Sequence, residues 1–298
     1  MEIKHLKHSD IDLKKWDNTI LSSPFPFVFA QSYYLNSTCP NWDALIIGDY
    51  ESVFPLTHHT KFGIPYLSQP SFTPQLGVYG LVNIQIEEAI NNYITSNYKL
   101  IEIELNTSNK FETKYHSKKS TYFIEYDKEY KQNQNTKRNI AKAIDNGLHF
   151  EPIQYADVIE LSTTYLTPFL SKTLHLSPNT ISKFNVLLKS AMENKSLYSF
   201  KVVDSKNNIK ALAHFISNGK HAVYLKGTNF DKSENSGSMH FLTNNAIQFF
   251  ETKSSFFDFG GGSKESLATF YKGFGALPIT YNTLKINKLP WLIKLFKK

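Results

Sequence analysis

The order in which two kinds of apolar pattern follow each other is the feature that most constrains the fold of this chain. Apolar residues have helical spacing in residues 81–94, and a strict alternation of Ile101, Ile103 and Leu105 with glutamates follows. The second half repeats this order, with strands predicted between residues 197 and 231, then a helix, then a strand near 255–260. Both halves therefore predict mixed α/β layers, in which helices cover a central mixed β-sheet.

Length supports the same division into two parts. A chain of 298 residues is comfortable for two domains of ordinary size. We expect an N-terminal domain over 1–147 that ends in a basic connecting helix, a C-terminal domain over 148–288, and an amphipathic basic tail over 289–298. No short sequence is repeated, so the predicted duplication concerns the plan of the two halves.

Composition identifies a globular protein with a basic surface. Hydrophobic residues make up 41% and aromatic residues 14%, which is enough apolar material for buried sheets and helices. The 33 Lys and Arg against 26 Asp and Glu give a net charge of +7, which leaves room for an anionic partner such as a nucleotide, RNA or a lipid headgroup. Most of these lysines are scattered singly, which is more typical of a solvated surface. An RNA-binding protein would show a steep dependence of affinity on salt.

The sequence favours a reducing compartment and argues against a metal site. Cys39 is the only cysteine, so no intramolecular disulfide can form, and it is expected to be a small packed residue. The charged N-terminus does not have the pattern of a signal peptide, and no uncharged apolar run approaches the length needed to span a bilayer. We therefore predict a cytoplasmic protein. The ten histidines lack the spacing of metal ligands, so no metal is expected.

The tail 289–298 mixes apolar residues with lysines. This pattern is compatible with weak peripheral contact with a membrane, or with packing against the first domain, which we favour.

Three glycines, Gly260–Gly262, stand between a predicted strand and a predicted helix. Such a turn can cradle an anion with its backbone N–H groups, or it can simply allow positive φ and close packing. The spacing matches neither a P-loop nor a dinucleotide fingerprint. Asp258 precedes the turn and is either a base or a cap for the turn.

Several segments together resemble the Fem-type branch of the GNAT acyltransferase superfamily. The final segment "FDFGGGSKESLATFYKGFGA" contains an aromatic-Asp-aromatic-Gly strand end and a helix with an aromatic-Lys-x-x-Phe-Gly signature. The helix in "NTKRNIAKAIDNGLHFE" is similar to the basic segment between the two domains of that family. "PLTHHTKFGIPYLSQPSFTPQLGVYG" resembles a stretch of the first domain, so the resemblance spans 42–288.

The resemblance implies tandem GNAT-like domains and an enzyme that transfers an acyl or aminoacyl group onto an amine. The acceptor would be a small molecule or a cell-envelope precursor, possibly a cell-wall or glycan precursor. The donor would be acyl-CoA or aminoacyl-tRNA, with no permanently bound cofactor, and tRNA is a possible partner whereas DNA is not expected. The alternative is a non-catalytic protein that binds an anionic glycan, nucleotide or peptide in a cleft between the domains.

The resemblance also implies where site residues lie. Such transfer depends on positioning and preorganised donors and needs no covalent intermediate. The loop that holds pyrophosphate corresponds to Ser236, Gly237 and Ser238, although the usual glycine-rich motif is absent there. Tyr271 lies where a tyrosine often protonates the leaving group, and a packed core tyrosine is the alternative. Taken with the residue types themselves, the candidates for catalysis are Asp258, Tyr271 and Lys272, and those for substrate binding are Lys61, Tyr66, Gln69, Gln75, Lys137, Arg138 and Lys226. Among the cations, Lys226 stands out because it lies at the end of a predicted apolar strand, next to Gly227.

Overall fold

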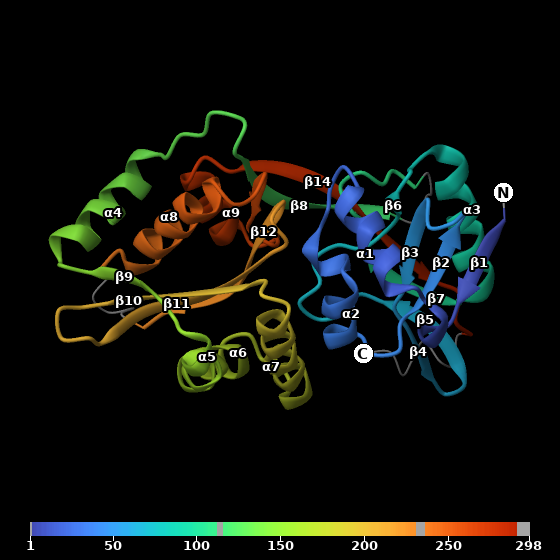
Figure 1. The fold of residues 1–298 in the computed structure, drawn as a ribbon, viewed down its shortest axis with the longest axis horizontal. Helices are drawn as coiled ribbons and strands as arrows, with labels where there is room; N and C mark the ends of the chain where they lie inside the picture. Colours follow the sequence, from blue (N-terminus) through green and yellow to red (C-terminus); the bar gives the residue numbers. More distant parts are fainter. Residues whose placement is uncertain (1, 112–115, 231–235, 291–298) are drawn as a thin grey trace. The chain divides into compact units, whose positions relative to one another are not determined.

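The computed structural model describes residues 2–111, 116–230 and 236–290, and the chain divides into two compact units (Figure 1). The first unit contains residues 1–119 and 280–298, and the second contains residues 120–279. The chain passes from the first unit to the second within strand β8 (His116–Glu125) and returns within strand β14 (Leu277–Asn287).

These bounds differ from the domains expected at 1–147 and 148–288. The basic helix α4 (Gln134–Asp145) is not a connector, because its buried residues Thr136 and Ala143 pack it into the second unit, against α8 (Ser238–Glu251). The end of β14 belongs to the first unit, because Leu284 and Ile286 are buried in the core of that unit. Leu289 and Pro290 are described, whereas the remainder of the predicted tail, 291–298, lies outside the described residues.

The first unit contains two groups of strands. An antiparallel group has the order β1-β2-β3-β6, and a second group has the order β4-β5-β7-β14, in which β5 and β7 are parallel. Its strands are β1 (Ile3–Leu6), β2 (Asp43–Ile47), β3 (Ser52–Leu56), β4 (His58–Lys61), β5 (Ile64–Ser68), β6 (Tyr79–Gly80) and β7 (Leu100–Glu104). Its α-helices are α1 (Leu13–Ser22), α2 (Ser32–Thr38) and α3 (Ile84–Asn97).

Helix α3 shows how the sequence pattern determines this packing. The side chain of Asn83 accepts a hydrogen bond from the backbone N–H of Ile86 and begins the helix. Ile86, Ile90 and Ile94 then recur at helical spacing and are buried against the strands in one apolar cluster.

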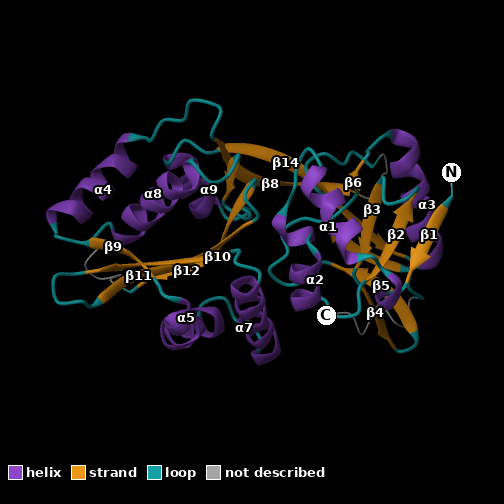
Figure 2. Cartoon of the chain, in the orientation of Figure 1, coloured by secondary structure: helices purple, strands orange, loops and turns teal. Residues whose placement is uncertain are grey.

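The second unit has one sheet with helices on both faces (Figures 1 and 2). Its strand order is β8-β13-β12-β11-β10-β9, and only the pair β12–β13 is parallel. Helices α4, α8 and α9 cover one face, and α5, α6 and α7 lie on the other. The remaining strands are β9 (His149–Pro152), β10 (Leu197–Val203), β11 (Ile209–Ser217), β12 (His221–Asn229) and β13 (Phe256–Asp258). The remaining helices are α5 (Tyr155–Leu161), α6 (Thr167–Lys172), α7 (Pro178–Glu193) and α9 (Glu265–Gly273), with a π-helical turn at Ser162–Leu166.

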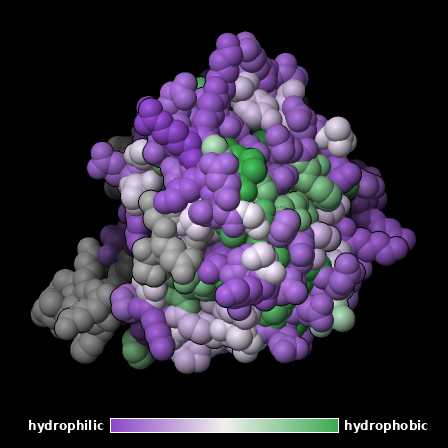
Figure 3. Space-filling view, turned by 90° about the vertical axis from the view of Figure 1, so that its left-hand side faces the viewer, coloured by the Kyte–Doolittle hydropathy of each residue, from purple (hydrophilic) through white to green (hydrophobic). Residues whose placement is uncertain are grey.

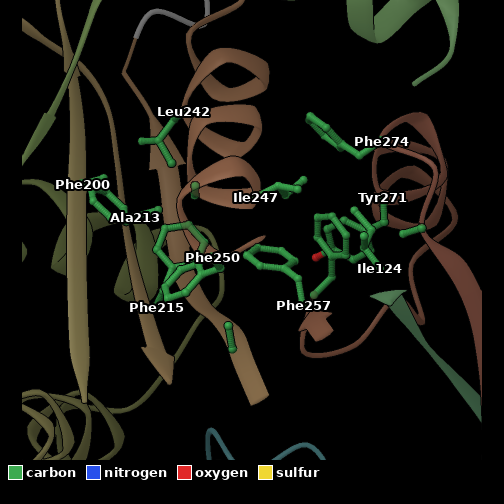
Figure 4. Close-up of a cluster of buried hydrophobic side chains, with 14 of the residues drawn as sticks. Ile124, Phe200, Ala213, Phe215, Leu242, Ile247, Phe250, Phe257, Tyr271 and Phe274 are labelled. Carbon is green, nitrogen blue, oxygen red and sulfur yellow. The ribbon is translucent and has the colours of Figure 1, made fainter. Parts of the chain in front are cut away.

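The core of the second unit is rich in aromatic residues (Figure 4). The buried face of α8, which includes Leu242, Ile247 and Phe250, packs against the sheet. The rings of Phe250 and Phe257 lie 6.0 Å apart, so helix α8 and strand β13 share this core.

The sequence-based expectation of mixed α/β layers is confirmed. The order of elements matches the predicted order, and α2 is a helix that the sequence analysis did not predict. Cys39 is buried, as expected of a packed residue.

The glycine run forms a tight turn. Gly260, Gly261 and Gly262 have φ values of 69°, 145° and 148°, and a Cβ on Gly262 would overlap the ring of Tyr122. The turn therefore requires glycine for its conformation and its packing, whether or not it contacts a ligand.

The surface agrees with the scattered charges of the sequence. The face at the α4 and β9 end of the second unit is covered mostly by hydrophilic residues, with smaller apolar patches between them (Figure 3). Within the described part of the chain, no helix is both long enough and apolar enough to cross a bilayer. The same residues contain no group of three or more His, Cys, Asp or Glu side chains that could hold a metal ion.

Candidate functional site

Each unit contains a parallel pair of strands. In the first unit this pair is β5 and β7, and the residues that follow β5 continue to form hydrogen bonds with β7. Strand β5 pairs with β7 over Tyr66–Ser68. Beyond this point, the side-chain oxygen of Gln69 accepts a hydrogen bond from the N–H of Glu104 at 2.9 Å. The N–H of Leu76 donates to the carbonyl of Glu104 at 2.7 Å, so the segment after β5 occupies the edge of β7.

In the second unit the parallel pair is β12 and β13, and β12 extends beyond the end of β13. Strand β12 pairs with β13 only over His221–Val223, although β12 continues to Asn229. A bulge lies in β12 just after this pairing: Tyr224 is opposite Phe215 of β11 and Lys226 is opposite His214, which leaves Leu225 as the extra residue. A bulge bends a strand and increases its twist. All three residues of β13 pair with β12, and β12 continues for six residues beyond the last pair.

A pocket of about 460 Å³ opens where β12 extends beyond β13. Its walls come from the end of β12, the beginning of α8, the helix α9 and the region around α6. Seven of the lining side chains are apolar or aromatic and seven are polar or charged, so the pocket can contact both kinds of group in a small-molecule ligand. The lining residues are Phe169, Leu174, Tyr224, Lys226, Gly227, Thr228, Asn229, Ser236, Gly237, Ser238, Met239, His240, Ser266, Leu267, Phe270 and Tyr271.

The predicted loop Ser236–Ser238 lies in this pocket, at the N-terminus of α8. Gly237 has a φ of 79°, and a Cβ on it would overlap the backbone oxygen of Asn139 in α4. The glycine therefore permits both the turn into α8 and the close contact with α4. The backbone N–H groups of the first helical turn, of which that of Ser238 donates to the hydroxyl of Ser236 at 3.3 Å, and the helix dipole favour a negative charge at this end of the pocket.

Lys226 places a cation in the same pocket. It is partly exposed, through the pocket, and no carboxylate of a described residue lies within ion-pair distance of it. Burial lowers the pKa of Lys226, and the charge of Lys264 lowers it further. An anionic ligand beside the ammonium group would therefore stabilise the charged form of Lys226.

Tyr271 is both a core residue and a part of the pocket wall. Its ring stacks on Phe259 at 4.4 Å and lies among the aromatic side chains of the core beside Phe257 and Ile124 (Figure 4). Its hydroxyl makes no hydrogen bond to a described residue. Burial, with a smaller effect of the Asp258 charge, raises the pKa of Tyr271 to about 12, so the hydroxyl is protonated at neutral pH and can donate a hydrogen bond or a proton.

The sequence analysis missed several residues of the pocket. His240 lies in the first turn of α8, with its ring 4.8 Å from that of Phe270, and burial lowers its pKa. Tyr224, Phe169 and Leu174 come from strand and helix positions that look like ordinary core in the sequence. The sequence offered one indication of these residues, which is that His240 lies two residues after the predicted loop Ser236–Ser238.

Asp258 lies in the interior and does not line the pocket. Its carboxylate accepts hydrogen bonds from Thr121 at 2.7 Å and from the N–H of Gly260 at 2.8 Å, and it lies 3.3 Å from His221. This position fits the alternative of a cap for the glycine turn and does not suit a base that touches a substrate. Lys272 is exposed, with its ammonium 5.9 Å from the ring of Tyr122, and it is also outside the pocket.

The basic residues predicted on the connecting helix lie elsewhere in the second unit. Lys137 and Arg138 are exposed on α4, and Lys137 lines a separate hollow with Tyr130 and Glu251.

The residues predicted in the first unit do not form a described pocket. Lys61 is exposed at the β4–β5 hairpin, where it lies over the ring of Phe62. Tyr66 packs against His59. Gln69 is held by Glu104 and by the carbonyl of Thr73, and Gln75 is fully buried.

Comparisons with known proteins place this geometry in a structural family. No family model and no curated protein sequence matches the chain. The crystal structure of FemX matches with a TM-score of 0.68 and 13% identity, over 100% of both chains. L-PGS from Bacillus licheniformis matches with a TM-score of 0.57 and 10% identity, over 96% of this chain and 95% of that one. A tandem GNAT protein from the clavulanic acid biosynthesis pathway matches with a TM-score of 0.54 and 8% identity, over 97% and 99%.

At these identities the likeness concerns the fold, and it extends along nearly the full length of each chain. The matches include a Fem-type protein and a protein whose printed description is a tandem GNAT protein. This chain has the tandem GNAT-like fold that the sequence predicted.

Proposed function

We propose that this protein is an acyltransferase that transfers an acyl or aminoacyl group from a donor in the second-unit pocket onto an amine. The observation that carries the proposal is the pocket that opens where β12 extends beyond the end of β13, at the N-terminus of α8. This opening combines an apolar channel with a site for a negative charge, which suits a donor that has an acyl arm and a phosphate group.

The donor is proposed to be acyl-CoA or aminoacyl-tRNA. Either donor carries phosphate, which the N–H groups of Ser238 and its neighbours at the start of α8 would hold. The apolar side chains Phe169, Leu174 and Phe270 would exclude water around the acyl arm.

The chemistry assigned to the pocket is direct attack by the amine. The acceptor amine forms a bond to the acyl carbon while the bond from that carbon to the sulfur or oxygen of the donor breaks. Tyr271, protonated at neutral pH, would supply a proton to the departing atom and then regain one from solvent, to which the amine loses its own proton. No covalent enzyme intermediate is required.

The acceptor is proposed to be a small molecule or a cell-envelope precursor. This part of the proposal rests on the likeness to FemX and to the tandem GNAT protein, and the pocket itself does not select among amines.

The test is binding of two donors to the full-length protein. Isothermal titration with CoA and acetyl-CoA, and filter binding with alanyl-tRNA, should show saturable binding of at least one donor. Gly237→Ala disturbs the start of α8 and should weaken that binding, whereas Gly147→Ala at the far end of α4 should not. Release of free thiol or free tRNA on adding an amine then reports transfer.

Failure of both donors to bind would overturn the proposal. Binding of CoA without turnover on any of a panel of amines, amino acids and amino sugars would instead support the alternative of a non-catalytic binding protein.

A further inference from the structure

Two features of the pocket attract anions, namely the N-terminus of α8 and the ammonium group of Lys226. They reach the pocket from opposite faces of the sheet. Residues directly opposite each other in an antiparallel pair place their side chains on the same face. Tyr224 is opposite Phe215, whose ring contacts Phe250 of α8 at 5.8 Å, so this pair faces α8. Lys226 is opposite His214, whose ring lies 6.1 Å from Phe184 of α7, so Lys226 projects from the α7 side.

The two features therefore approach the pocket from different sides, which suits two separate anionic groups. A phosphate at the N-terminus of α8 lies on the face of Tyr224, and the ammonium of Lys226 approaches the pocket from the other face. On that face the pocket is also lined by Phe169, Leu174 and Thr228, none of which carries a charge.

The charges around Lys226 favour a single negative charge in this part of the pocket. Lys264 is close enough to repel it, while Tyr224 and Tyr271 are neutral at physiological pH because burial raises the pKa of each. Across the strand pair, burial lowers the pKa of His214 to about 3, so that imidazole is also neutral. His240 shares the pocket, and burial lowers its pKa too.

Resting on the proposed function, we propose that Lys226 is a specificity-determining residue that binds a carboxylate carried by the transferred acyl group or by the amine acceptor. One lysine, with the hydroxyl of Thr228 on the same face and without an arginine fork, matches one singly charged group better than a phosphate. The extra negative charge distinguishes this ligand from a plain acetyl donor and from an uncharged amine.

The first test compares two donors with the same number of acyl carbons. Wild-type protein should bind succinyl-CoA at least tenfold more tightly than butyryl-CoA if the carboxylate belongs to the acyl group. Lys226→Met should remove this preference, Lys226→Arg should keep part of it, and Lys189→Met, which removes an exposed lysine on α7, should behave as wild type. Thermal unfolding checks that each variant is folded.

The second test places the carboxylate on the acceptor. With CoA present, the wild-type protein should bind L-alanine but not L-alaninamide, and Lys226→Met should lose this difference. A preference in either test that disappears in Lys226→Met supports the proposal. If the CoA ligands bind, equal binding by the wild type in both tests, or a preference that survives in Lys226→Met, overturns it.

A third measurement separates this proposal from the proposed function. Succinate alone should raise the pKa of Lys226, measured by NMR of its labelled Cε, because a bound anion stabilises the ammonium form. If no donor binds but succinate still shifts this pKa, the donor assignment fails and the carboxylate site stands. No shift with succinate, together with no preference in the first two tests, overturns the carboxylate site.

Discussion

The carbonyl oxygen of Asn139 in α4 occupies the space that a Cβ on Gly237 would need, so the start of α8 fits against α4 only with glycine at this position. Two helices that are distant in sequence thereby fix the loop that forms one end of the pocket. The predictions below separate residues that hold this site in shape from residues that act in it.

Gly237→Ala should lower the free energy of unfolding by about 2–4 kcal/mol, since it adds a left-handed non-glycine residue and a backbone overlap. Gly147→Ala is the matched control, because Gly147 has a φ of 64° with no atom within 4 Å of an added Cβ. The free energy of unfolding of Gly147→Ala should fall by only the cost of a left-handed non-glycine residue, about 1–2 kcal/mol. Urea unfolding of both variants measures the difference, and equal losses would contradict the overlap.

Tyr271→Phe should lower the rate of acyl transfer by about 100-fold or more, because it removes the proposed proton donor and keeps the ring that packs on Phe259. Donor affinity and thermal stability should change little. Single-turnover kinetics with saturating donor provides the measurement. A rate within threefold of the wild-type value would exclude Tyr271 as the acid and leave it a core residue.

Asp258→Ala should reduce the free energy of unfolding by about 3 kcal/mol, because Thr121, His221 and the N–H of Gly260 lose a buried partner. Asp258→Asn keeps an acceptor oxygen and should recover part of this stability. The transfer rate per folded molecule should stay near that of the wild type in Asp258→Asn. A properly folded but inactive Asp258→Asn protein would restore the catalytic role that the sequence suggested.

Stability should decrease in acid because of His214. Its pKa falls from 6.5 when unfolded to about 3 when folded, owing to burial. The unfolded state therefore binds the proton more readily, so this stabilising contribution is complete above pH 6.5 and is lost as the pH falls toward 3. Urea unfolding at several pH values should show this loss, and the slope should be smaller in His214→Asn. An NMR titration in which the His214 ring protonates near pH 6.5 would refute it.

Lys137→Ala combined with Arg138→Ala should weaken the binding of tRNA if these exposed residues of α4 contact phosphates. The slope of log affinity against log salt should become less steep by about one to two units, because two phosphate contacts are lost. The affinity for CoA should not change, since neither residue lines the pocket. An unchanged salt slope would remove both residues from the substrate-binding set.

The pocket shows which parts of the site were accessible from the sequence. Ser236–Ser238 and Tyr271 were found through a resemblance, and Lys226 through its place at the end of an apolar strand. His240, Tyr224 and Phe169 were not found, because their side chains reach the pocket only through the packing of separate helices and strands. The sequence suggested a catalytic role for Asp258. Its hydrogen-bond partners Thr121 and His221 come from other strands of the sheet, so its structural role could not be predicted from the sequence around it.

The sequence by itself determined the order of helices and strands, since apolar periodicity and caps act over a few neighbouring residues. It also determined the glycine turn, because only glycine tolerates these backbone angles. Only the tertiary structure determined the bounds of the two units, the extension of β12 beyond β13 and the burial of Asp258. These features depend on contacts between residues far apart in the chain, such as Gly237 with Asn139, which no local pattern encodes.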